Sequence, residues 1–569
     1  MKTLQAGSVS VKYDNGFLRQ ISYGETEVLR MIYFALRDHN WNTLVSVIEN
    51  ESISTNEKDF IITYDCFHMD GGVCVMEWKG RIEGKPDGTI IFEIQGSAME
   101  NFKKNRAGFC ALHPLNITNQ KCKITHPDNT QTTHLFPLQV VPENPFKNIR
   151  SMAWQTSGIP FSLSFEGDIF ETEDQRNWSD ASFKTFCTPL DQPFPVELKK
   201  GQKVFQRITF KPESTLQPIK NGPSYISLRD IGTNSIIPAL GIAASTEMST
   251  LPLHAVSLIR ALNLSHYRVD VFPAKDNWVT LFSHDYENGF ALGLMVEVAL
   301  HLTDNYRQET ESFVLLCQQN RVKVKKILLL QSNGLVTRQE VIEQVSTLKE
   351  ALPKVSFGAG TNYNFNEINK NHFTPRDLDF ISFSIDPQEH AFDDLTILEN
   401  LEAQSHLVNS AKSIYGHSMP VHISPITLRK RYNPYATNPN GLFIDESRKA
   451  DPRQKEVFAA TWTFGSICSL TKTGASALTY YQTIGNQGIM SEQADPYPVY
   501  DTLKSFAAFQ GKRVNIPESS DPLRVQAILV ENEALGLVNL TDQGIEVRMD
   551  NIILSLGPYE IKFETLHRT

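Results

Sequence analysis

The sequence lacks the long apolar runs and the leader pattern that would place it in or across a membrane. No window of 18 or more uncharged apolar residues occurs, so we expect no transmembrane helix. The first residues, MKTLQAGSVSVKYDNG, contain no charged stretch followed by an apolar one, which is not the pattern of a secretory signal. These absences predict a cytoplasmic protein.

Cysteine is scarce and shows no paired spacing. The seven cysteines are odd in number and none has the spacing of a metal finger, so we expect reduced thiols in a reducing compartment. HExxH and clustered Cys/His sets are also absent, which argues against a structural zinc. The sequence therefore indicates no cofactor, and it leaves open a divalent metal held by carboxylates.

Positive charge is also in short supply. The formal net charge is −10, and the strongest basic cluster is the short LRKRY at 428–432. Such a charge balance repels polyanions, so we expect neither a nucleic acid nor an anionic membrane as a partner. A small-molecule partner fits better, and self-association is left open.

Several signatures of enzyme families are missing. The sequence has no GxSxG nucleophile elbow and no P-loop, and no GxGxxG follows its apolar strands. These absences argue against an α/β-hydrolase, a P-loop nucleotide hydrolase and a doubly wound dinucleotide-binding sheet.

What is present is enough sequence for several domains, since 569 residues exceed one hydrophobic core. Residues 1–215 alternate apolar and polar residues in short runs such as SVSVKY and TIIFEIQG, separated by turn signals such as DNG and PDG. This pattern is typical of an antiparallel β-sandwich.

A different pattern covers residues 225–512. Short apolar strands alternate there with amphipathic segments, of which 338–351 and 397–414 are expected helices. Eight strands joined by helical crossovers predict a (β/α)8 TIM barrel that carries the active site. The expected barrel strands are 240–245, 266–272, 290–298, 325–331, 354–360, 379–386, 419–424 and 477–482.

Residues 515–569 return to a β pattern, in runs such as VQAILVEN and YEIKFETL. This segment is too short for a robust core of its own, so we expect it to pack on the barrel or to join the N-terminal sandwich. The predicted fold class is thus a multidomain α/β plus β protein, with a central barrel, an N-terminal sandwich and a small C-terminal β domain.

Barrel active sites lie at the C-terminal ends of the strands, which turns the strand list into a residue list. Arg268 and Asp270 share one face of a strand, where they either contact the substrate or form a structural ion pair inside the barrel. Glu297 ends an expected strand, Glu367 lies in the Asn-rich loop TNYNFNEIN, and His390 follows a strand among carboxylates. We predict these last three as the acid–base set, because burial and charged neighbours shift pKa values toward catalytic use.

Other polar residues at the expected strand ends are candidates for substrate binding. For each of these residues the alternative is a structural role, as a turn former, a helix cap or a buried polar group with its hydrogen bonds satisfied. They are Asn362, Asp386, His422, Tyr480 and Gln482.

The segment EDQRNWSDASFKTFCTPL (173–190) has many polar groups and neither helical nor strand periodicity. Buried polar groups need partners, so folding alone does not call for this mixture. Such a segment is either a ligand surface or a joint between domains or subunits. We take Arg176, Asn177 and Asp180 as its candidate substrate residues.

Four other segments are RMIYFALRDHNW (30–41), RAGFCALHP (106–114), HYRVDV (266–271) and EHAFDD (389–394). Together with segments 173–190 and 361–369, they resemble the D-apionate lactonases of bacteria. The resemblance runs from about residue 10 through the barrel. It implies hydrolysis of the sugar-acid lactone D-apionolactone to the open acid during breakdown of D-apiose. It also implies a β domain, a barrel and a small C-terminal β domain, and it carries over no catalytic residue.

The favoured hypothesis is therefore a carboxylic ester hydrolase that activates water by acid–base catalysis on a sugar lactone. One alternative is a glycoside hydrolase on apiose-containing or other plant glycans. The expected fourth strand, however, ends in Gln331-Ser332-Asn333 and lacks the Asn-Glu pair of many such enzymes. The other alternative is a non-catalytic carbohydrate-binding protein, because Gln482 stands near a position where the resemblance implies Glu.

Overall fold

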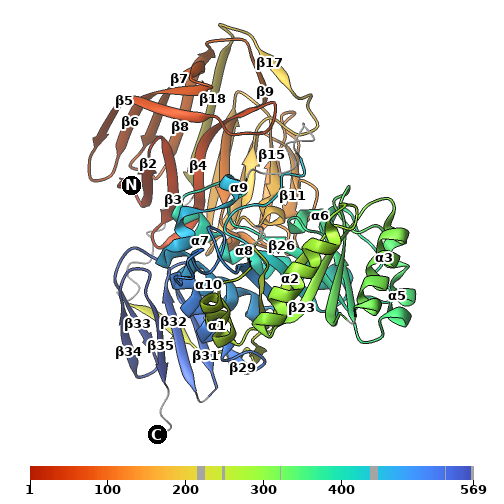
Figure 1. Ribbon diagram of the computed structural model, residues 1–569. Helices are drawn as coiled ribbons and strands as arrows, with labels where there is room; N and C mark the ends of the chain where they lie inside the picture. The colour runs from red at the N-terminus through yellow and green to blue at the C-terminus, as the bar shows by residue number, and fades with distance from the viewer. Residues whose placement is uncertain (214–224, 246–249, 321, 436–445, 532, 566–569) are drawn as a thin grey trace. The chain divides into compact units, whose positions relative to one another are not determined.

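The computed structural model describes residues 1–213, 225–245, 250–320, 322–435, 446–531 and 533–565 (Figure 1). The chain divides into two compact units. Unit 1 comprises Met1–Gln175 and Ala181–Gly222, and unit 2 comprises Arg176–Asp180 and Pro223–Thr569. Within the described residues, no helix combines the length and the apolar character needed to cross a membrane.

Unit 1 consists of two nine-stranded sheets, and every strand pair in them is antiparallel. The first sheet, in spatial order, contains β1 (Lys2–Ala6), β2 (Val9–Asp14), β3 (Phe17–Tyr23), β4 (Thr26–Asp38), β9 (Phe102–His113), β16 (Phe183–Phe186), β15 (Phe170–Asp174) and β12 (Phe146–Ile149), with β17 (Val196–Leu198) also beside β9. The second contains β11 (Gln131–Leu135), β10 (Lys121–Thr125), β13 (Ser151–Thr156), β14 (Ile159–Glu166), β18 (Lys203–Pro212), β8 (Ile90–Ala98), β7 (Val73–Gly84), β6 (Phe60–Asp70) and β5 (Val45–Thr55).

The two sheets pack through aromatic side chains that alternate along their strands. Phe109 of the first sheet contacts Phe92 of the second, with ring centroids 4.7 Å apart. Phe34 of the first sheet likewise lies 5.2 Å from Trp78 of the second. The alternation predicted from the sequence places these rings on the inner faces, so the antiparallel sandwich is confirmed.

Unit 2 contains a closed barrel of eight parallel strands, as predicted. Its strands are β21 (Ala239–Ala243), β22 (His266–Val271), β23 (Met295–Leu302), β24 (Val324–Gln331), β25 (Ser356–Gly360), β26 (Phe380–Ile385), β27 (Val421–Ile426) and β28 (Ala477–Gln482). The helices described in this unit are α1 (Leu253–Leu262), α2 (Trp278–Leu292), α3 (Tyr306–Gln319), α4 (Gln339–Ile342), α5 (Val345–Ala351), α6 (Phe365–Lys370), α7 (Asp394–Glu399), α8 (Leu401–Tyr415), α9 (Glu446–Lys449), α10 (Val457–Lys472) and α11 (Pro498–Ala507).

The third barrel strand differs from the prediction. The apolar run FALGLMVEV led us to expect a strand at 290–298, but residues 290–292 are the end of α2 and β23 begins at Met295. A continuous apolar run does not distinguish a buried helix end from a strand. Gly293, with a φ of 70°, ends the helix in the left-handed conformation that glycine favours.

The start of the barrel also differs from the predicted boundary at 225. Two short strands, β19 (Ile226–Arg229) and β20 (Ser235–Ile236), pair with C-terminal strands, and the barrel begins only at β21. The C-terminal strands are β29 (Arg513–Asn515), β30 (Glu518–Ser519), β31 (Val525–Val530), β32 (Ala534–Asn539), β33 (Ile545–Met549), β34 (Ile552–Leu556) and β35 (Ile561–Thr565).

These strands form two small sheets, in the orders β30-β19-β33-β34 and β20-β29-β31-β32-β35. Ile226 and Leu228 of β19 share a buried cluster with residues of β31, β32 and β33. Phe563 of β35 contacts Phe464 of α10 and Phe506 of α11, at ring separations of 5.7 and 5.9 Å. Of the two expected placements, the C-terminal segment therefore takes the one against the barrel.

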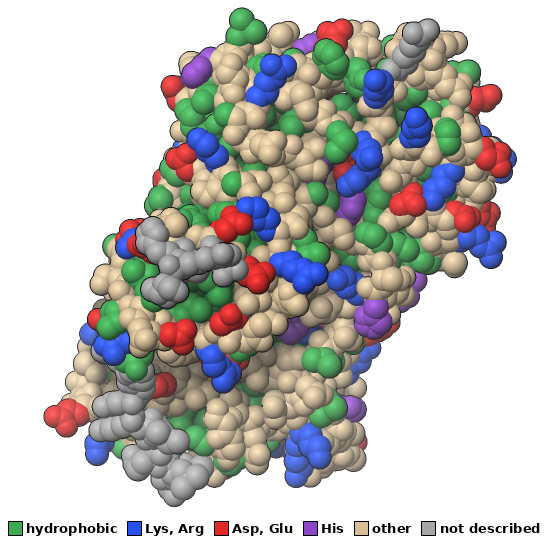
Figure 2. All heavy atoms as spheres, turned by 90° about the horizontal axis from the view of Figure 1, so that it is seen from below, with side chains coloured by type: hydrophobic (Ala, Val, Ile, Leu, Met, Phe, Trp, Pro, Cys, Tyr) green, Lys and Arg blue, Asp and Glu red, His purple; other side chains and the backbone are tan. Residues whose placement is uncertain are grey.

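The surface drawn in Figure 2 shows Lys and Arg side chains interspersed with Asp and Glu side chains, and no area of one sign dominates it.

Candidate active site

The barrel interior contains a mostly buried polar cluster toward the N-terminal ends of its strands, in which Lys326 is half-buried. It includes His266 of β22, Glu297 of β23, Lys326 of β24 and His422 of β27. Gly241 makes room for the ring of His266, since a Cβ there would lie 2.2 Å from Nε2. Lys326 Nζ lies 3.5 Å from Oε2 of Glu297.

Glu297 is thus not the strand-end residue that we predicted. It is the third residue of β23, it is 2% exposed, and the strand runs on to Leu302. Burial acts to raise the pKa of Glu297, but the neighbouring His266, His422, Lys326 and Arg268 more than offset it, and its pKa lies below the ordinary value. Glu297 and His422 therefore belong to an internal network, and neither lines the pocket at the C-terminal strand ends.

We expect the two histidines of this network to make unit 2 sensitive to acid. Burial lowers the pKa of His266 to about 4 and that of His422 to about 3. Below an unfolded pKa of about 6.5, the unfolded chain binds protons that the folded chain does not, so stability falls as the pH drops. Each histidine should remove about 2 kcal/mol of unfolding free energy between pH 6.5 and pH 5.

We expect His422→Gln to reduce this loss by about 2 kcal/mol relative to the parent protein, as measured by urea unfolding at pH 6.5 and pH 5. His417→Gln is the control, because His417 is exposed. An equal loss in the parent protein and in His422→Gln would contradict the assignment.

Above this layer, Arg268 organises the middle of the barrel. Its guanidinium donates to both carboxylate oxygens of Asp270 at 2.7 and 3.1 Å, to Oγ of Ser424 at 3.1 Å and to Oδ1 of Asn362 at 2.9 Å. His301 Nε2 lies 2.7 Å from Asp270, and since an ionised carboxylate only accepts, this nitrogen carries the proton. Burial acts to raise the pKa of Asp270, but Arg268 and His301 outweigh it and hold the pKa well below its ordinary value.

A pocket opens at the C-terminal strand ends, with a volume of about 430 Å³ when the solvent at its mouth is counted. Asn362, Glu367 and Asp386 line it, so three of the predicted site residues meet there. The other lining residues are Trp178, Tyr363, Asn364, Ser384, Ile385, Glu389, Thr427, Lys430, Arg431, Tyr432, Asn433, Pro434 and Tyr435.

Glu367 is the most constrained carboxyl group of the pocket. It lies in α6, is fully buried, and its Oε1 accepts from Asn366 Nδ2 at 3.0 Å and from the Tyr435 hydroxyl at 2.7 Å. Its Oε2 has no hydrogen-bond partner among the described residues. Burial raises the pKa of Glu367, against the two hydrogen bonds. This combination suits a group that accepts and releases a proton during catalysis.

Asp386 and Glu389 add two more carboxyl groups. Burial and the nearby Glu389 raise the pKa of Asp386 well above its ordinary value, so this carboxyl group tends to keep its proton. Glu389 accepts from Asn364 Nδ2 at 2.8 Å and pairs with Lys430 at 3.0 Å. The pocket thus holds a carboxyl group whose protonated form is favoured by its surroundings, beside the pair of Glu389 and Lys430.

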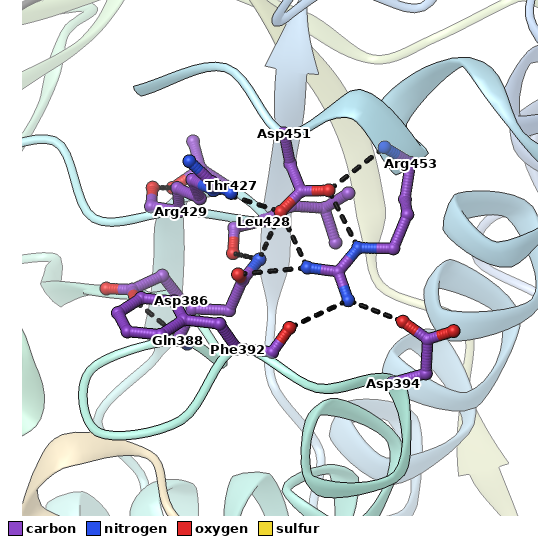
Figure 3. A network of polar contacts seen from close by, with 9 residues as sticks. All are labelled: Asp386, Gln388, Phe392, Asp394, Thr427, Leu428, Arg429, Asp451 and Arg453. Atoms are coloured by element: carbon purple, nitrogen blue, oxygen red, sulfur yellow. Dashed lines mark hydrogen bonds and ion pairs between the residues drawn. The ribbon is translucent and has the colours of Figure 1, made fainter. Parts of the chain in front are cut away.

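A buried aspartate ties together the loops that carry these groups (Figure 3). Asp451 accepts from Gln388 in the loop after β26, from Arg429 in the loop after β27, and from both the backbone and the guanidinium of Arg453. Arg453 in turn donates to Gln388 at 3.1 Å and to Asp394 at 2.6 Å. The loops bearing Asp386 and Arg431 are therefore joined by hydrogen bonds through Asp451.

The predicted substrate residues of segment 173–190 do not line the pocket. They are anchors, which hold this segment to other residues of unit 2 through hydrogen bonds. Arg176 donates to Nδ1 of His406 at 2.9 Å, and Asn177 accepts from Asn369 at 2.8 Å. Asp180 accepts from His390 at 2.6 Å and from Asn400 at 3.1 Å. Arg176, Asn177 and Asp180 are all buried, and none of them lines the pocket.

His390 consequently stands apart from the acid–base set that we predicted. Its Nδ1 is bonded to Asp180, and neither His390 nor Glu297 lines the pocket that contains Glu367. The three residues do not surround a common hollow, because Glu297 lies near the start of its strand and His390 binds Asp180.

Strand β28 corrects another prediction. The Tyr480 hydroxyl donates to Ser466 of α10 at 2.8 Å, so this side chain points to the outer helix and not to the barrel mouth. Tyr481, with a φ of 56°, interrupts the regular alternation of the strand. Gln482 ends β28, its backbone N–H donates to Gln487 O at 3.0 Å, and its side chain does not line the pocket.

Some site residues escaped the sequence analysis. His301, which binds Asp270 but does not line the pocket, lies beyond the expected third strand, which ends at residue 298. Trp178 and Tyr435 were missed because no periodicity relates them to the barrel. Lys430 and Arg431 were visible in the basic cluster LRKRY directly after β27, which was the available signal. Among the residues that the structure describes, no three His, Cys, Asp or Glu side chains are spaced to hold a metal ion.

Comparison with known families gives a consistent match over most of the chain. Residues 1–215 match the family model described as D-apionate lactonase, N-terminal domain, and residues 240–511 match that described as D-apionate lactonase, TIM barrel domain. A D-apionate lactonase of Brucella anthropi is 28% identical over 592 aligned positions, covering 98% of this chain and 96% of the relative.

Solved structures with a partial likeness include two glycosidases. A family 51 α-L-arabinofuranosidase from Bifidobacterium longum is 11% identical, with a TM-score of 0.43, and covers 61% of this chain and 96% of its own. A GH30 endoxylanase from Clostridium papyrosolvens is 12% identical, with a TM-score of 0.38, and covers 58% of this chain and 88% of its own.

Proposed function

This chain belongs to the D-apionate lactonase family, and from that premise we propose that its barrel pocket hydrolyses a sugar-acid lactone. The finer proposal is the opening of D-apionolactone to D-apionate in the breakdown of D-apiose, which makes the chain a carboxylic ester hydrolase. The observation that supports it most is the buried carboxyl group of Glu367, which has a raised pKa and one oxygen without a partner among the described residues.

In the proposed first step, a water molecule attacks the carbonyl carbon of the lactone while Glu367 accepts a proton from it. The carbonyl electron pair moves to its oxygen, which becomes an oxyanion. Lys430 and Arg431 line the same pocket and supply positive charge for this oxygen.

In the second step, the oxyanion collapses and the bond between the carbonyl carbon and the ring oxygen breaks. Asp386, which holds its proton because its pKa is raised, gives that proton to the departing ring oxygen. The product is the open hydroxy acid, which releases one proton at neutral pH. Proton exchange with solvent restores Glu367 and Asp386.

The test is a pH-indicator assay on a panel of aldonolactones that includes D-apionolactone, corrected for spontaneous hydrolysis. We expect rapid acid release from at least one five-membered lactone and no release of sugar from aryl glycosides. Repeating the assay after treatment with a chelator reads out any metal requirement. Sugar release from an aryl apioside, with no lactone turned over, would replace the proposal by a glycosidase.

A further inference from the structure

The five residues Arg176–Asp180 lie between β15 and β16 in the sequence, yet they group with the barrel unit. Four of their hydrogen bonds reach barrel-unit residues His390, Asn369, Asn400 and His406. Asp180 alone accepts two of these bonds while only 4% exposed. These four hydrogen bonds attach the segment to the barrel unit.

The residue that these anchors present to the pocket is Trp178. It lines the pocket and is half-buried, whereas the flanking anchors are buried. Its ring packs edge-on against Tyr435, with centroids 5.4 Å apart and planes at 73°. Lys370 Nζ lies 6.0 Å from the Trp178 ring. Trp178 and Tyr435 therefore form one aromatic wall of the pocket.

The rest of the pocket lining is mostly polar, although Tyr363, Ile385, Tyr432 and Pro434 also contribute to it. Asn362, Asp386 and Lys430 offer hydrogen-bond partners and charge, while Trp178 offers a large apolar ring. A five-membered sugar lactone has hydroxyl groups and a carbonyl that need polar partners, and ring C–H groups that gain from burial against an apolar surface. The pocket thus combines an aromatic surface for the ring C–H groups with polar side chains for the hydroxyl and carbonyl groups of the lactone.

We propose that Trp178 is a specificity-determining residue that packs against the C–H face of a five-membered lactone ring, and that Asp180 acts as a positioning residue for it. The inference rests on the proposed lactonase function. It adds that the segment between two sandwich strands, and not the barrel alone, selects the ring of the substrate.

The experiment measures kcat, KM and inhibition on D-erythrono-1,4-lactone, with the corresponding γ-lactam as a slowly hydrolysed inhibitor. The variants are Trp178→Ala, Trp178→Phe and, as the matched control, Trp278→Ala. Trp278 is also half-buried in the barrel unit and does not line the pocket. Thermal melts verify that each variant is folded.

We expect Trp178→Ala to raise the inhibition constant of the lactam and the KM by about tenfold, with kcat changed less than about threefold. Trp178→Phe should recover most of the loss, because a ring remains, and Trp278→Ala should behave like the parent protein. An unchanged inhibition constant in Trp178→Ala overturns the proposal. So does a fall in kcat alone, which would mean that Trp178 acts through Tyr435 on Glu367.

The positioning role of Asp180 is tested by a double-mutant cycle. Asp180→Ala should raise the inhibition constant, and adding it to Trp178→Ala should cost less than about twofold more, because the two changes act through one contact. Fully additive effects would remove Asp180 from this role.

Turnover and binding are measured separately, so the lactonase proposal and the role of Trp178 can each be contradicted independently. If the parent protein turns over no lactone, calorimetry with the lactam still reports whether binding depends on Trp178. Lactone turnover with Trp178-independent binding would leave the lactonase proposal intact and overturn the aromatic wall.

Discussion

Glu367→Gln is expected to lower kcat/KM at least about a hundredfold while the protein remains folded, because general acid–base groups contribute about 10²- to 10⁴-fold to turnover. Glutamine keeps the size of the side chain and can still accept from Asn366 and Tyr435, but it cannot take a proton from water. The measurement is lactone hydrolysis by the purified variant, with a thermal melt to verify folding.

Glu309→Gln is the matched control for this prediction. Glu309 is also buried in the barrel unit and also accepts hydrogen bonds, from the backbone N–H and the hydroxyl of Thr303, but it does not line the pocket. It should retain activity within a few-fold. If Glu367→Gln keeps its activity too, Glu367 is not part of the mechanism.

The pH profile gives a second test of Glu367. A general base works only when it is deprotonated, so kcat/KM should rise with pH through the pKa of Glu367. Because burial raises that pKa, the midpoint of the rise should lie above 4.5, the ordinary value for this carboxyl group. In Glu367→Gln this rising limb should disappear from the residual activity.

Arg268→Met is expected to lower the free energy of unfolding by about 3–5 kcal/mol, the usual cost of removing one partner of a buried ion pair. Arg268 is 1% exposed and makes hydrogen bonds to Asp270, Ser424 and Asn362. Methionine preserves the apolar stem and leaves the Asp270 carboxylate without its main counter-charge. Urea unfolding at pH 7 measures the change.

The control for Arg268→Met is Arg307→Met, because Arg307 is exposed on α3 and its removal should cost less than about 0.5 kcal/mol. Adding Asp270→Asn to Arg268→Met should recover part of the loss, since the unpaired charge is then gone. A cost below about 1 kcal/mol for Arg268→Met would show that the pair is not needed for stability.

The same pair has a pH dependence of known sign. The folded pKa of Asp270 is depressed, so its contribution to stability is present above an unfolded pKa of about 3.9 and is lost as the pH falls toward the folded pKa. In Arg268→Met the folded pKa should rise, and this part of the acid sensitivity should shrink.

Much of the fold could be predicted from local patterns. Seven of the eight barrel strands lie where short apolar runs place them, because a buried parallel strand needs apolar residues on both faces. The exception, β23, follows the end of α2 within one apolar run. The pairing of β19 with β33 joins residues that are more than 300 positions apart, and no local pattern encodes such a partner.

Some residues of the candidate site could be predicted from the sequence, and others could not. Asn362 and Glu367 lie in the segment after the expected strand 354–360, and Asp386 ends the expected strand 379–386, so the rule for barrel active sites was enough to find them. The prediction for Glu297 was wrong because a shift in the start of a strand moves a side chain to another height in the barrel. The prediction for Tyr480 was wrong because the strand is irregular at Tyr481.

By itself, the sequence determined the antiparallel sandwich, the eight-stranded barrel and the family, because periodicity and local motifs are properties of neighbouring residues. Only the tertiary structure decided that Trp178 lines the pocket, that Asp180 binds His390, and that Tyr435 holds Glu367. These are contacts between segments far apart along the chain. Their geometry depends on how the backbone closes in space, which no spacing of residues along the sequence records.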